Sequence, residues 1–214
     1  MIHKPILPRR WNKDLAYIFG LLLGDGSLPV SATKRPLGRR QRFQKRHIIH
    51  FFSNSKEFII NTFIPCFYKL FHLTPRITLQ KRKSNLYCAT IESKKLYTYL
   101  EKKGFTVGKK AKIARVPSSL PQKYYPELLA GLLDTDGGKK GNGFGLSTAS
   151  RYLASFCIKM FEKFGLPYHS CPWRYKNHIY HQIYIGSKHM HKLLKAIPLE
   201  NNEKVTFLKS HMPR

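Results

Sequence analysis

The sequence predicts an α+β fold made of two similar halves, each with the order helix, two strands, helix, two strands, helix. Three observations lead to this prediction. A helical motif occurs twice, a second shared segment follows each copy, and stretches of alternating polar and apolar residues lie between helices with recognisable caps. With 214 residues, of which 42% are hydrophobic, the chain is long enough for one large domain or two small ones with a proper core.

The repeated motif is the clearest sign of duplication. Its first copy lies within Leu15–Leu28, which reads LAYIFGLLLGDGSL, and its second within Leu128–Lys139, which reads LLAGLLDTDGGK. Aligning the shared Gly-Leu-Leu places Asp25 on Asp136, and a glycine follows each of the two. A repeat of this kind predicts two copies of one structural unit.

A second shared segment shows that the duplication continues beyond the motif. Ile91–Leu100 and Ile185–Leu194 agree in Ile, Ser, Lys and Leu at matching places. The distance from the motif to this segment is longer in the first half, so the first half contains extra residues. We place them in the basic stretch 29–46, which we expect to be extended or looped.

The remaining elements follow from caps and alternation. In the first half we expect a helix over about 12–24, a strand near 47–52, a helix to about 73 capped by Asn54 or Ser55, strands at 76–82 and 85–91, and a helix to about 103 capped by Ser93. In the second half we expect a helix ending near Asp134, a strand at 144–148, a helix capped by Ser150, strands at 168–176 and 179–185, and a helix from Ser187. The halves are then 1–108 and 124–214, joined by a connector over 109–123.

The charge balance indicates the class of partner. Lys and Arg total 39 against 11 Asp and Glu, which gives a formal net charge of +28. Such a chain favours a polyanion, and nucleic acid fits because binding releases its counterions. A membrane surface is another polyanion, and a ribosomal protein would have a similar charge, so basicity alone does not indicate an enzyme. The longest apolar run, Leu15–Leu23, is much shorter than the ~20 residues of a membrane-spanning helix.

The cysteines give no sign of a metal site or of disulfides. Cys66, Cys88, Cys157 and Cys171 are not paired at CxxC spacing and form no zinc pattern. We expect them to be core thiols of an intracellular, reducing compartment.

The aspartates carry the strongest functional signal. Only four occur in the chain, and two of them, Asp25 and Asp136, close equivalent apolar helices. The negative end of the helix dipole repels a carboxylate there, and a bound divalent cation would reverse that effect. Small residues recur at helical spacing along both helices, which lets two backbones approach closely. These residues are Ala16, Gly20 and Gly24 in the first helix and Gly131 and Thr135 in the second.

These segments resemble the motif that defines the LAGLIDADG homing endonucleases. Residues 129–137, LAGLLDTDG, match it at seven of nine positions, and residues 18–26, IFGLLLGDG, match it at four, keeping the central Gly, the acidic Asp and the final Gly. Two motifs in one polypeptide resemble the single-chain members of the family. The resemblance implies two saddle-shaped antiparallel sheets that straddle DNA, with the motif helices packed at the interface between two pseudo-symmetric αββαββα repeats.

The resemblance also implies an activity and a set of site residues. It implies a double-strand break across the minor groove with short 3′ overhangs, and Mg²⁺ (or Mn²⁺) held by Asp25 and Asp136 with the carbonyls of Gly24 and Thr135 as further ligands. The basic active-site candidates are Lys139, just past the second motif, either Lys110 or Lys112 after the third helix of the first half, and Lys204 in the equivalent place of the second half. Asp134 matches the other acidic residue of the motif, but its first-half equivalent is Leu23, so we expect Asp134 to be structural.

Alternation on the strands selects candidates for DNA contacts. Arg can pair with guanine and Gln with adenine in the major groove, whereas surface lysines more often meet phosphates. The candidates are Arg39, Arg40, Arg42, Arg46, Arg76, Thr78, Gln80, Lys81, Arg82, Lys83, Lys140, His178, Tyr180, Gln182 and Tyr184.

We therefore expect a monomeric enzyme that binds double-stranded DNA and needs neither a membrane nor a protein partner. Two alternatives remain open at this stage. Some relatives act as maturases that bind their intron RNA, and the same scaffold without cleavage would be a DNA-binding regulator. The presence of both acids favours cleavage over the regulator, but it does not exclude a maturase.

Overall fold

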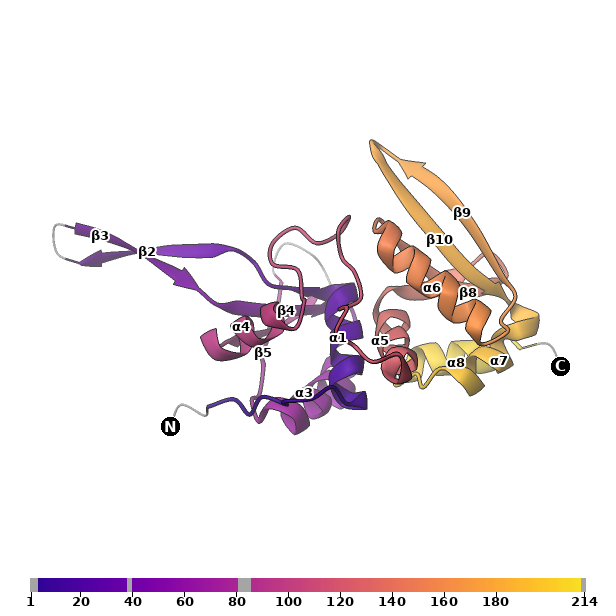
Figure 1. Cartoon of the computed structure of the whole chain (residues 1–214), viewed down its shortest axis with the longest axis horizontal. Helices are drawn as coiled ribbons and strands as arrows, with labels where there is room; N and C mark the ends of the chain where they lie inside the picture. Colours follow the sequence, from indigo (N-terminus) through magenta and orange to yellow (C-terminus); the bar gives the residue numbers. More distant parts are fainter. Residues whose placement is uncertain (1–3, 38–39, 81–85, 213–214) are drawn as a thin grey trace.

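The computed structural model describes residues 4–37, 40–80 and 86–212, and of residues 31–44 it describes the backbone alone. Two halves lie side by side, with helix α1 of the first half against helix α5 of the second at the centre (Figure 1). Each half contains a four-stranded antiparallel sheet and several helices. The fold is therefore the predicted α+β arrangement of two similar units.

The first half follows the expected order of elements. It contains α1 (Lys13–Asp25), β1 (Gly26–Ser27), β4 (Ile48–Ser53), α2 (Lys56–Phe58), the π-helical turn η1 (Ile59–Phe63), α3 (Ile64–Phe71), β5 (Arg76–Leu79), β6 (Tyr87–Glu92) and α4 (Lys94–Lys102). The strand order in its sheet is β1-β4-β6-β5. Ser55, rather than Asn54, caps α2 by accepting a hydrogen bond from the amide of Phe58. Helix α3 ends at Phe71 because His72 adopts a left-handed conformation, with a φ of 51°.

The second half repeats this order. It contains η2 (Gln122–Tyr124), α5 (Tyr125–Asp136), β7 (Gly137–Lys140), β8 (Gly143–Thr148), α6 (Arg151–Lys163), β9 (Tyr168–Tyr175), β10 (His178–Gly186), η3 (Ser187–His189), α7 (Met190–Ala196) and α8 (Asn202–Ser210). Its strand order, β7-β8-β10-β9, is the counterpart of the first sheet. Ser93 and Ser150 cap α4 and α6 as expected, and α8 is a helix that the sequence pattern did not predict.

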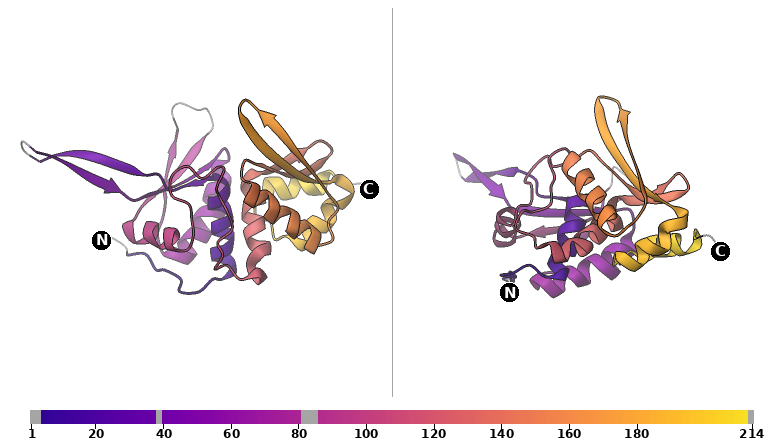
Figure 2. Two further views of the ribbon diagram at one scale, coloured as in Figure 1. Left: turned by 45° about the horizontal axis from the view of Figure 1, so that its top comes forward. Right: turned by 45° about the vertical axis from the view of Figure 1, so that its right-hand side comes forward.

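The extra residues of the first half form a hairpin. Strands β2 (Ser31–Leu37) and β3 (Arg40–Arg46) pair with each other between β1 and β4, whereas the equivalent β7 and β8 are joined by a short turn. This hairpin projects away from the body of the molecule, as does the end of the β9–β10 hairpin (Figure 2). The basic stretch 29–46 is therefore an antiparallel arm of the first half.

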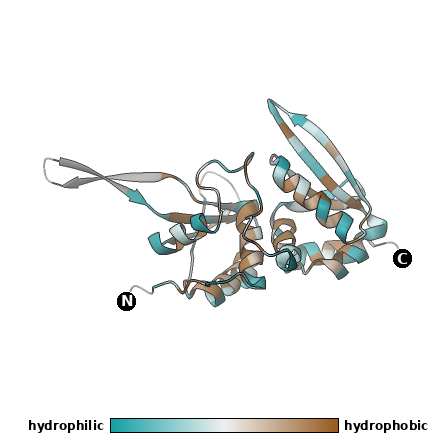
Figure 3. Cartoon of the chain, viewed as in Figure 1, coloured by the Kyte–Doolittle hydropathy of each residue, from teal (hydrophilic) through white to brown (hydrophobic). Residues whose placement is uncertain are grey.

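The two motif helices pack as closely as their small residues permit. A Cβ atom at Gly20 would lie 2.2 Å from the carbonyl oxygen of Leu128, and one at Gly131 would lie 2.3 Å from that of Tyr17. Only glycine fits at either position without moving the facing backbone. Residues Leu15–Leu23 are all buried, and α1 is largely apolar (Figure 3). The helix pair is therefore the apolar centre that joins both halves.

No helix in the described part of the chain is long and apolar enough to cross a membrane.

Candidate active site

The two motif helices end at the residues that the sequence singled out. Asp25 is the last residue of α1, and Asp136 is the last residue of α5. The next residue in each case is a glycine whose backbone turns back against its own helix. A Cβ atom at Gly137 would lie 2.2 Å from the carbonyl oxygen of Leu133, and one at Gly26 would be similarly obstructed. Glycine is thus required for the chain to pass directly from the helix into the first strand.

Close helix packing brings the two carboxylates together. A Cβ atom at Gly24 would lie 3.5 Å from the carboxyl carbon of Asp136 and 2.0 Å from the hydroxyl of Thr135. Burial, and then the negative charge of Asp25, raise the pKa of Asp136 to about 6. Burial likewise raises the pKa of Asp25, against the opposing effect of two lysines. Two half-buried carboxylates this close together are typical of a site that holds a cation.

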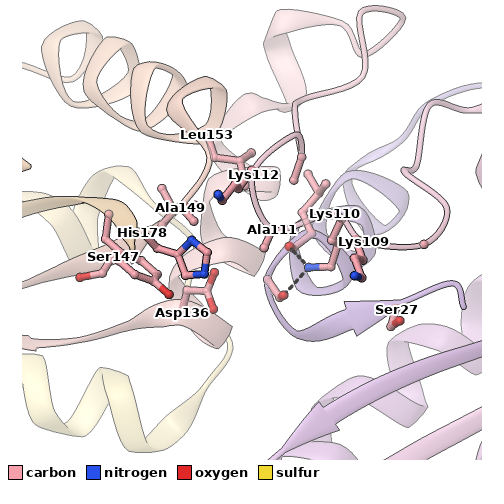
Figure 4. A pocket seen from close by; sticks show the side chains of 16 residues that line it. Ser27, Lys109, Lys110, Ala111, Lys112, Asp136, Ser147, Ala149, Leu153 and His178 are labelled. Carbon is pink, nitrogen blue, oxygen red and sulfur yellow. Dashed lines mark hydrogen bonds between the residues drawn. The ribbon is translucent and has the colours of Figure 1, made fainter. Parts of the chain in front are cut away.

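A lysine lies at each helix end. The Lys110 ammonium donates hydrogen bonds to the carbonyl oxygens of Leu23 and Gly24. The Lys204 ammonium donates to the carbonyl oxygens of Leu133, at 2.9 Å, and Thr135, at 2.7 Å. Figure 4 shows Lys110 with its two hydrogen bonds at the edge of a cavity. These lysines satisfy carbonyls that have no partner at a helix end, and their charge offsets the negative end of the dipole.

Burial affects the lysines as well. It lowers the pKa of Lys204 to about 8 and lowers that of Lys110, whereas the nearby aspartates act in the opposite direction. The two lysines occupy equivalent places of the repeat, as predicted, because 204 − 110 equals the offset of 94 between Ile91 and Ile185. Lys110 lies in the connector, whereas Lys204 lies in α8. The structure therefore unites two of the basic candidates with the two acids.

The other basic candidates lie elsewhere. Lys139 is exposed and pairs in register with the buried Phe144, so its side chain is on the helix-covered side of the sheet, away from the two acids. Lys140 is on the opposite side, and its charge lowers the pKa of Asp136. Lys112 is exposed and lines the cavity without a hydrogen bond to either helix end.

A cavity of about 780 Å³ opens beside the two helix ends, between the halves. It is lined by residues from both halves and from the connector, with several charged and polar side chains among apolar surface (Figure 4). The lining includes Asp136, Lys110, Lys112, Ser27, Ser147 and His178. It offers space for a charged substrate beside Asp136 and Lys110.

The donor atoms at this site fit a hard divalent cation. Asp25 and Asp136 supply carboxylates, and the carbonyl oxygens of Gly24 and Thr135 at the same helix ends each also accept a hydrogen bond from a lysine. No group of three or more His, Cys, Asp or Glu residues that would form an all-protein metal cage occurs in the described residues. Mg²⁺ commonly takes one or two carboxylates and completes its shell with water and substrate phosphates, so this sparse oxygen set suits it.

The faces of the two sheets turned away from the core carry the predicted contact residues. In the second half, the strand partners of His178, Tyr180, Gln182 and Tyr184 share their face, and Ile183 is buried on the other face, as alternation predicted. The partners that the sequence analysis missed are Tyr175, Trp173, Cys171 and His169. Their signal was present in the alternation of β9, but its register near Trp173 was ambiguous.

In the first sheet, Arg76 and Thr78 share the outward face with a polar cluster. His50 and Thr90 lie opposite each other on β4 and β6, with His50 Nδ1 3.2 Å from the Thr90 hydroxyl. Arg76 is exposed beside Thr90 on the neighbouring strand β5. Neither His50 nor Thr90 was predicted from the sequence, although both alternate with the buried core residues of their strands.

The basic arm is described only in part. Arg46 forms an ion pair with Glu92, with Nη2 2.6 Å from Oε2, so it is already engaged within the protein. Arg40 and Arg42 lie on β3, where the backbone alone is described. The predicted contacts Arg39, Lys81, Arg82 and Lys83 lie outside the described residues, and Gln80 lies just past the end of β5.

Comparisons with known proteins agree with this geometry. Residues 123–198 match the family model described as the LAGLIDADG-like domain. A search of curated proteins found no significant match. The structure of I-DmoI in complex with DNA and Ca is similar, with a TM-score of 0.64, 18% identity, and coverage of 93% of this chain and 98% of that one.

Two further structures have the same fold. The meganuclease I-SmaMI bound to uncleavable DNA has a TM-score of 0.61 and 11% identity, covering 94% of this chain and 88% of its own. The LAGLIDADG homing endonuclease I-LtrWI bound to target DNA has a TM-score of 0.61 and 11% identity, covering 92% of this chain and 89% of its own. The second half of this chain therefore contains a LAGLIDADG-like domain, and the whole chain has the two-repeat fold of the LAGLIDADG homing endonucleases.

Proposed function

We propose that this chain is a divalent-metal-dependent DNA endonuclease that makes a double-strand break in a long, specific site and leaves short 3′ overhangs. One observation carries the proposal. Two carboxylates and two lysines meet at the ends of the closely packed helices, and each half contributes one carboxylate. A site divided between two similar halves is suited to cutting two strands.

The proposed role of each residue follows from its place. Asp25 and Asp136 hold Mg²⁺, for which Mn²⁺ can substitute, with the Gly24 and Thr135 carbonyls as further ligands. The bound ion would stabilise the attacking and leaving oxygens of the phosphodiester. Lys110 and Lys204 keep positive charge beside the scissile phosphates, which favours the extra negative charge of the transition state.

Two features support this assignment. Solved structures of I-DmoI hold its DNA together with Ca, Mn or Mg, and the same fold here places oxygen donors at the paired helix ends. In the second half, His178 and Tyr180 of the outward sheet face line the cavity. A β-ribbon with such side chains can enter the major groove and read base edges.

The test compares Asp25→Asn and Asp136→Asn with Asp14→Asn. Asp14 lies at the start of the same helix α1 and forms an ion pair with Lys69, so it controls for the loss of one carboxylate. The substrate is a library of randomised duplexes with Mg²⁺, followed by sequencing of the cut ends. We expect Asp25→Asn and Asp136→Asn to abolish double-strand cleavage and to keep fold and DNA binding, whereas Asp14→Asn cuts normally.

The alternatives give different results in the same assay. Full cleavage by folded Asp25→Asn or Asp136→Asn protein would refute the shared-site mechanism. Specific binding by the wild type without any cleavage would support the DNA-binding regulator instead. Cut ends with blunt or 5′-extended termini would refute the overhang part of the proposal.

A second candidate function, binding of intron RNA, is favoured by the aromatic face of the β9–β10 hairpin. Trp173 stacks on Tyr180 with ring centroids 5.2 Å apart, and His169 stacks on Tyr184 at 5.0 Å. Trp173 is 42% exposed and Tyr175 is 53% exposed, and none of the described residues on this face is Lys or Arg. Exposed aromatic rings can stack on the unpaired bases of RNA.

Competition separates the two candidates. The same face is proposed to contact the DNA duplex, so single-stranded RNA that uses it should displace DNA. Replacing Trp173 with Ala should then weaken RNA binding by about tenfold or more, since stacking contributes ~1–3 kcal/mol per base. RNA that binds equally well to Trp173→Ala protein would remove the reason for this second candidate.

A further inference from the structure

Asp134 is a buried acid that the proposed chemistry does not use. Only 1% of the residue is exposed, although it is separated from the metal-binding candidate Asp136 by one residue. The Tyr17 hydroxyl donates to Asp134 Oδ2 at 2.7 Å, and the Glu200 amide donates to the same oxygen at 2.8 Å. Both donors reach Oδ2, and Oδ1 has no hydrogen-bond partner among the described residues. A buried, partly satisfied carboxylate is costly, so its presence requires a structural reason.

Two partners of Asp134 lie at the start of α8. Besides the Glu200 amide, the Asn201 side chain donates from Nδ2 to the main-chain oxygen of Asp134 at 3.1 Å. Asn201 is also the N-cap of α8, and its Oδ1 accepts from the amides of Glu203 and Lys204. The end of α5 therefore fixes the position and the beginning of α8.

Lys204 lies in the first turn of this helix. Its ammonium returns to the end of α5 and donates to the carbonyl oxygens of Leu133 and Thr135, on either side of Asp134. The carboxylate of Asp134 thus contacts the segment just before α8, and the lysine of α8 contacts the backbone around Asp134. These reciprocal contacts set where the ammonium of Lys204 lies.

The first half reaches the same arrangement differently. Its lysine, Lys110, comes from the connector, where its carbonyl oxygen accepts from the amides of Ile113 and Ala114. The position equivalent to Asp134 is Leu23, which is buried among apolar residues. The first half therefore has no need for an acid there, which accounts for the asymmetry between the two motifs.

We propose that Asp134 is a positioning residue that holds α8 against the end of α5 and so fixes Lys204 at the second-half active site. The role in cleavage rests on the proposed endonuclease function, whereas the role in holding α8 does not. Loss of this role displaces one lysine of the two, so it should impair cleavage of one DNA strand more than the other.

The test uses three variants with matched chemistry. Asp134→Leu introduces the residue found in the first half, Asp134→Asn keeps an acceptor oxygen for the Glu200 amide, and Tyr17→Phe removes only the cross-helix hydrogen bond. The substrate is a supercoiled plasmid that carries a duplex site selected from a randomised library with the wild-type protein, in Mg²⁺. We expect Asp134→Leu to slow one strand by ~100-fold, so that nicked circles accumulate, because a displacement of about 1 Å has effects of this size.

The conservative variants should behave differently. Asp134→Asn should cut both strands within a few-fold of the wild type, and Tyr17→Phe should do the same. The proposal is overturned by equal slowing of both strands in Asp134→Leu, by wild-type rates in that variant, or by a Tyr17→Phe defect as large as that of Asp134→Leu. The last result would assign Asp134 to joining the two helices rather than to holding α8.

A second readout does not depend on nuclease activity. Hydrogen exchange of the amides in α8, measured without DNA, should be faster in Asp134→Leu than in the wild type and unchanged in Asp134→Asn. Unchanged exchange in Asp134→Leu overturns the proposal even if the chain proves not to cut DNA. If Asp134→Leu does not fold, Asn201→Ala releases the start of α8 without altering the carboxylate. Unchanged hydrogen exchange in α8 of Asn201→Ala, or equal cleavage of both strands by it, then overturns the proposal.

Discussion

The packing of α1 on α5 gives a sharp test at Gly20. In an exposed helix, replacing Gly with Ala stabilises the protein by about 1 kcal/mol, because Ala has the higher helix propensity. Here the new Cβ atom would lie 2.2 Å from the carbonyl oxygen of Leu128, a contact that real Cβ atoms essentially never make below 3.0 Å. The obstructing atom is backbone, so the two helices must separate by about 1 Å.

The expected size follows from opposing terms. Overpacking of a close contact costs about 1–3 kcal/mol, and more where backbone must move, so the propensity gain offsets only part of it. We expect Gly20→Ala to lower the free energy of unfolding by about 1–2 kcal/mol, which corresponds to roughly 2–8 °C in Tm. Cleavage should fall by ~100-fold, because the shift moves Asp25 relative to Asp136.

The assay is thermal unfolding together with cleavage of a selected site. The control is Gly186→Ala, since a Cβ atom there has no neighbour within 4 Å and the residue has a negative φ. The sign of the change is decisive. A Gly20→Ala protein that is more stable than the wild type and cuts DNA normally would show that the two helices do not pack in this way.

Three further predictions concern pH, salt and mass. Burial raises the pKa of Asp136 to about 6 from its usual 3.8, so between these values the folded state keeps a proton that the unfolded chain releases, and the wild type loses stability as the pH rises. Urea unfolding in EDTA should therefore show that the free energy of unfolding of Asp136→Asn rises by on the order of 2–3 kcal/mol relative to that of the wild type between pH 4 and pH 7. No such rise would contradict the burial of this acid. DNA affinity should fall steeply with salt, with a log–log slope near −0.9 per phosphate neutralised, and a flat dependence would remove the nucleic-acid assignment. Light scattering should give the monomer mass of 25.0 kDa, and a stable dimer would contradict the presence of both half-sites in one chain.

Most of the fold follows from patterns that act locally. Ser93 and Ser150 precede apolar periodicity and cap their helices, and alternation on β10 separates buried Ile183 from outward Gln182. Because the motif occurs twice, these local predictions could be combined into an architecture of two similar units. Helix α8 was not predicted, because its residues, Asn202–Ser210, have no clear apolar periodicity and because no helix follows at the equivalent place in the described part of the first half.

The site was harder to predict where it depends on tertiary contacts. The duplicated motif identified both aspartates, since their positions lie within one helix each. The repeat relates Lys110 to Lys204, but nothing local distinguished this pair from Lys112 and Lys139. Lys139 lies closest to the motif in sequence, yet strand pleating turns it to the helix-covered side. Proximity in sequence was misleading because adjacent strand residues face opposite sides of a sheet.

The helix-end lysines also change the electrostatic argument that began with the sequence. A carboxylate at the negative end of a helix is unfavourable, and the sequence alone left a metal ion as the compensation. In the structure Lys110 and Lys204 already donate to the carbonyls at both helix ends, so the charges of Asp25 and Asp136 are balanced before any ion binds. A divalent ion alone would then leave this largely buried site, in a chain of net charge +28, with excess positive charge. Two scissile phosphates alone would leave an equal excess of negative charge. Under the proposed function the ion and the DNA compensate each other only when both are present, so each should strengthen the binding of the other, as reciprocal coupling requires.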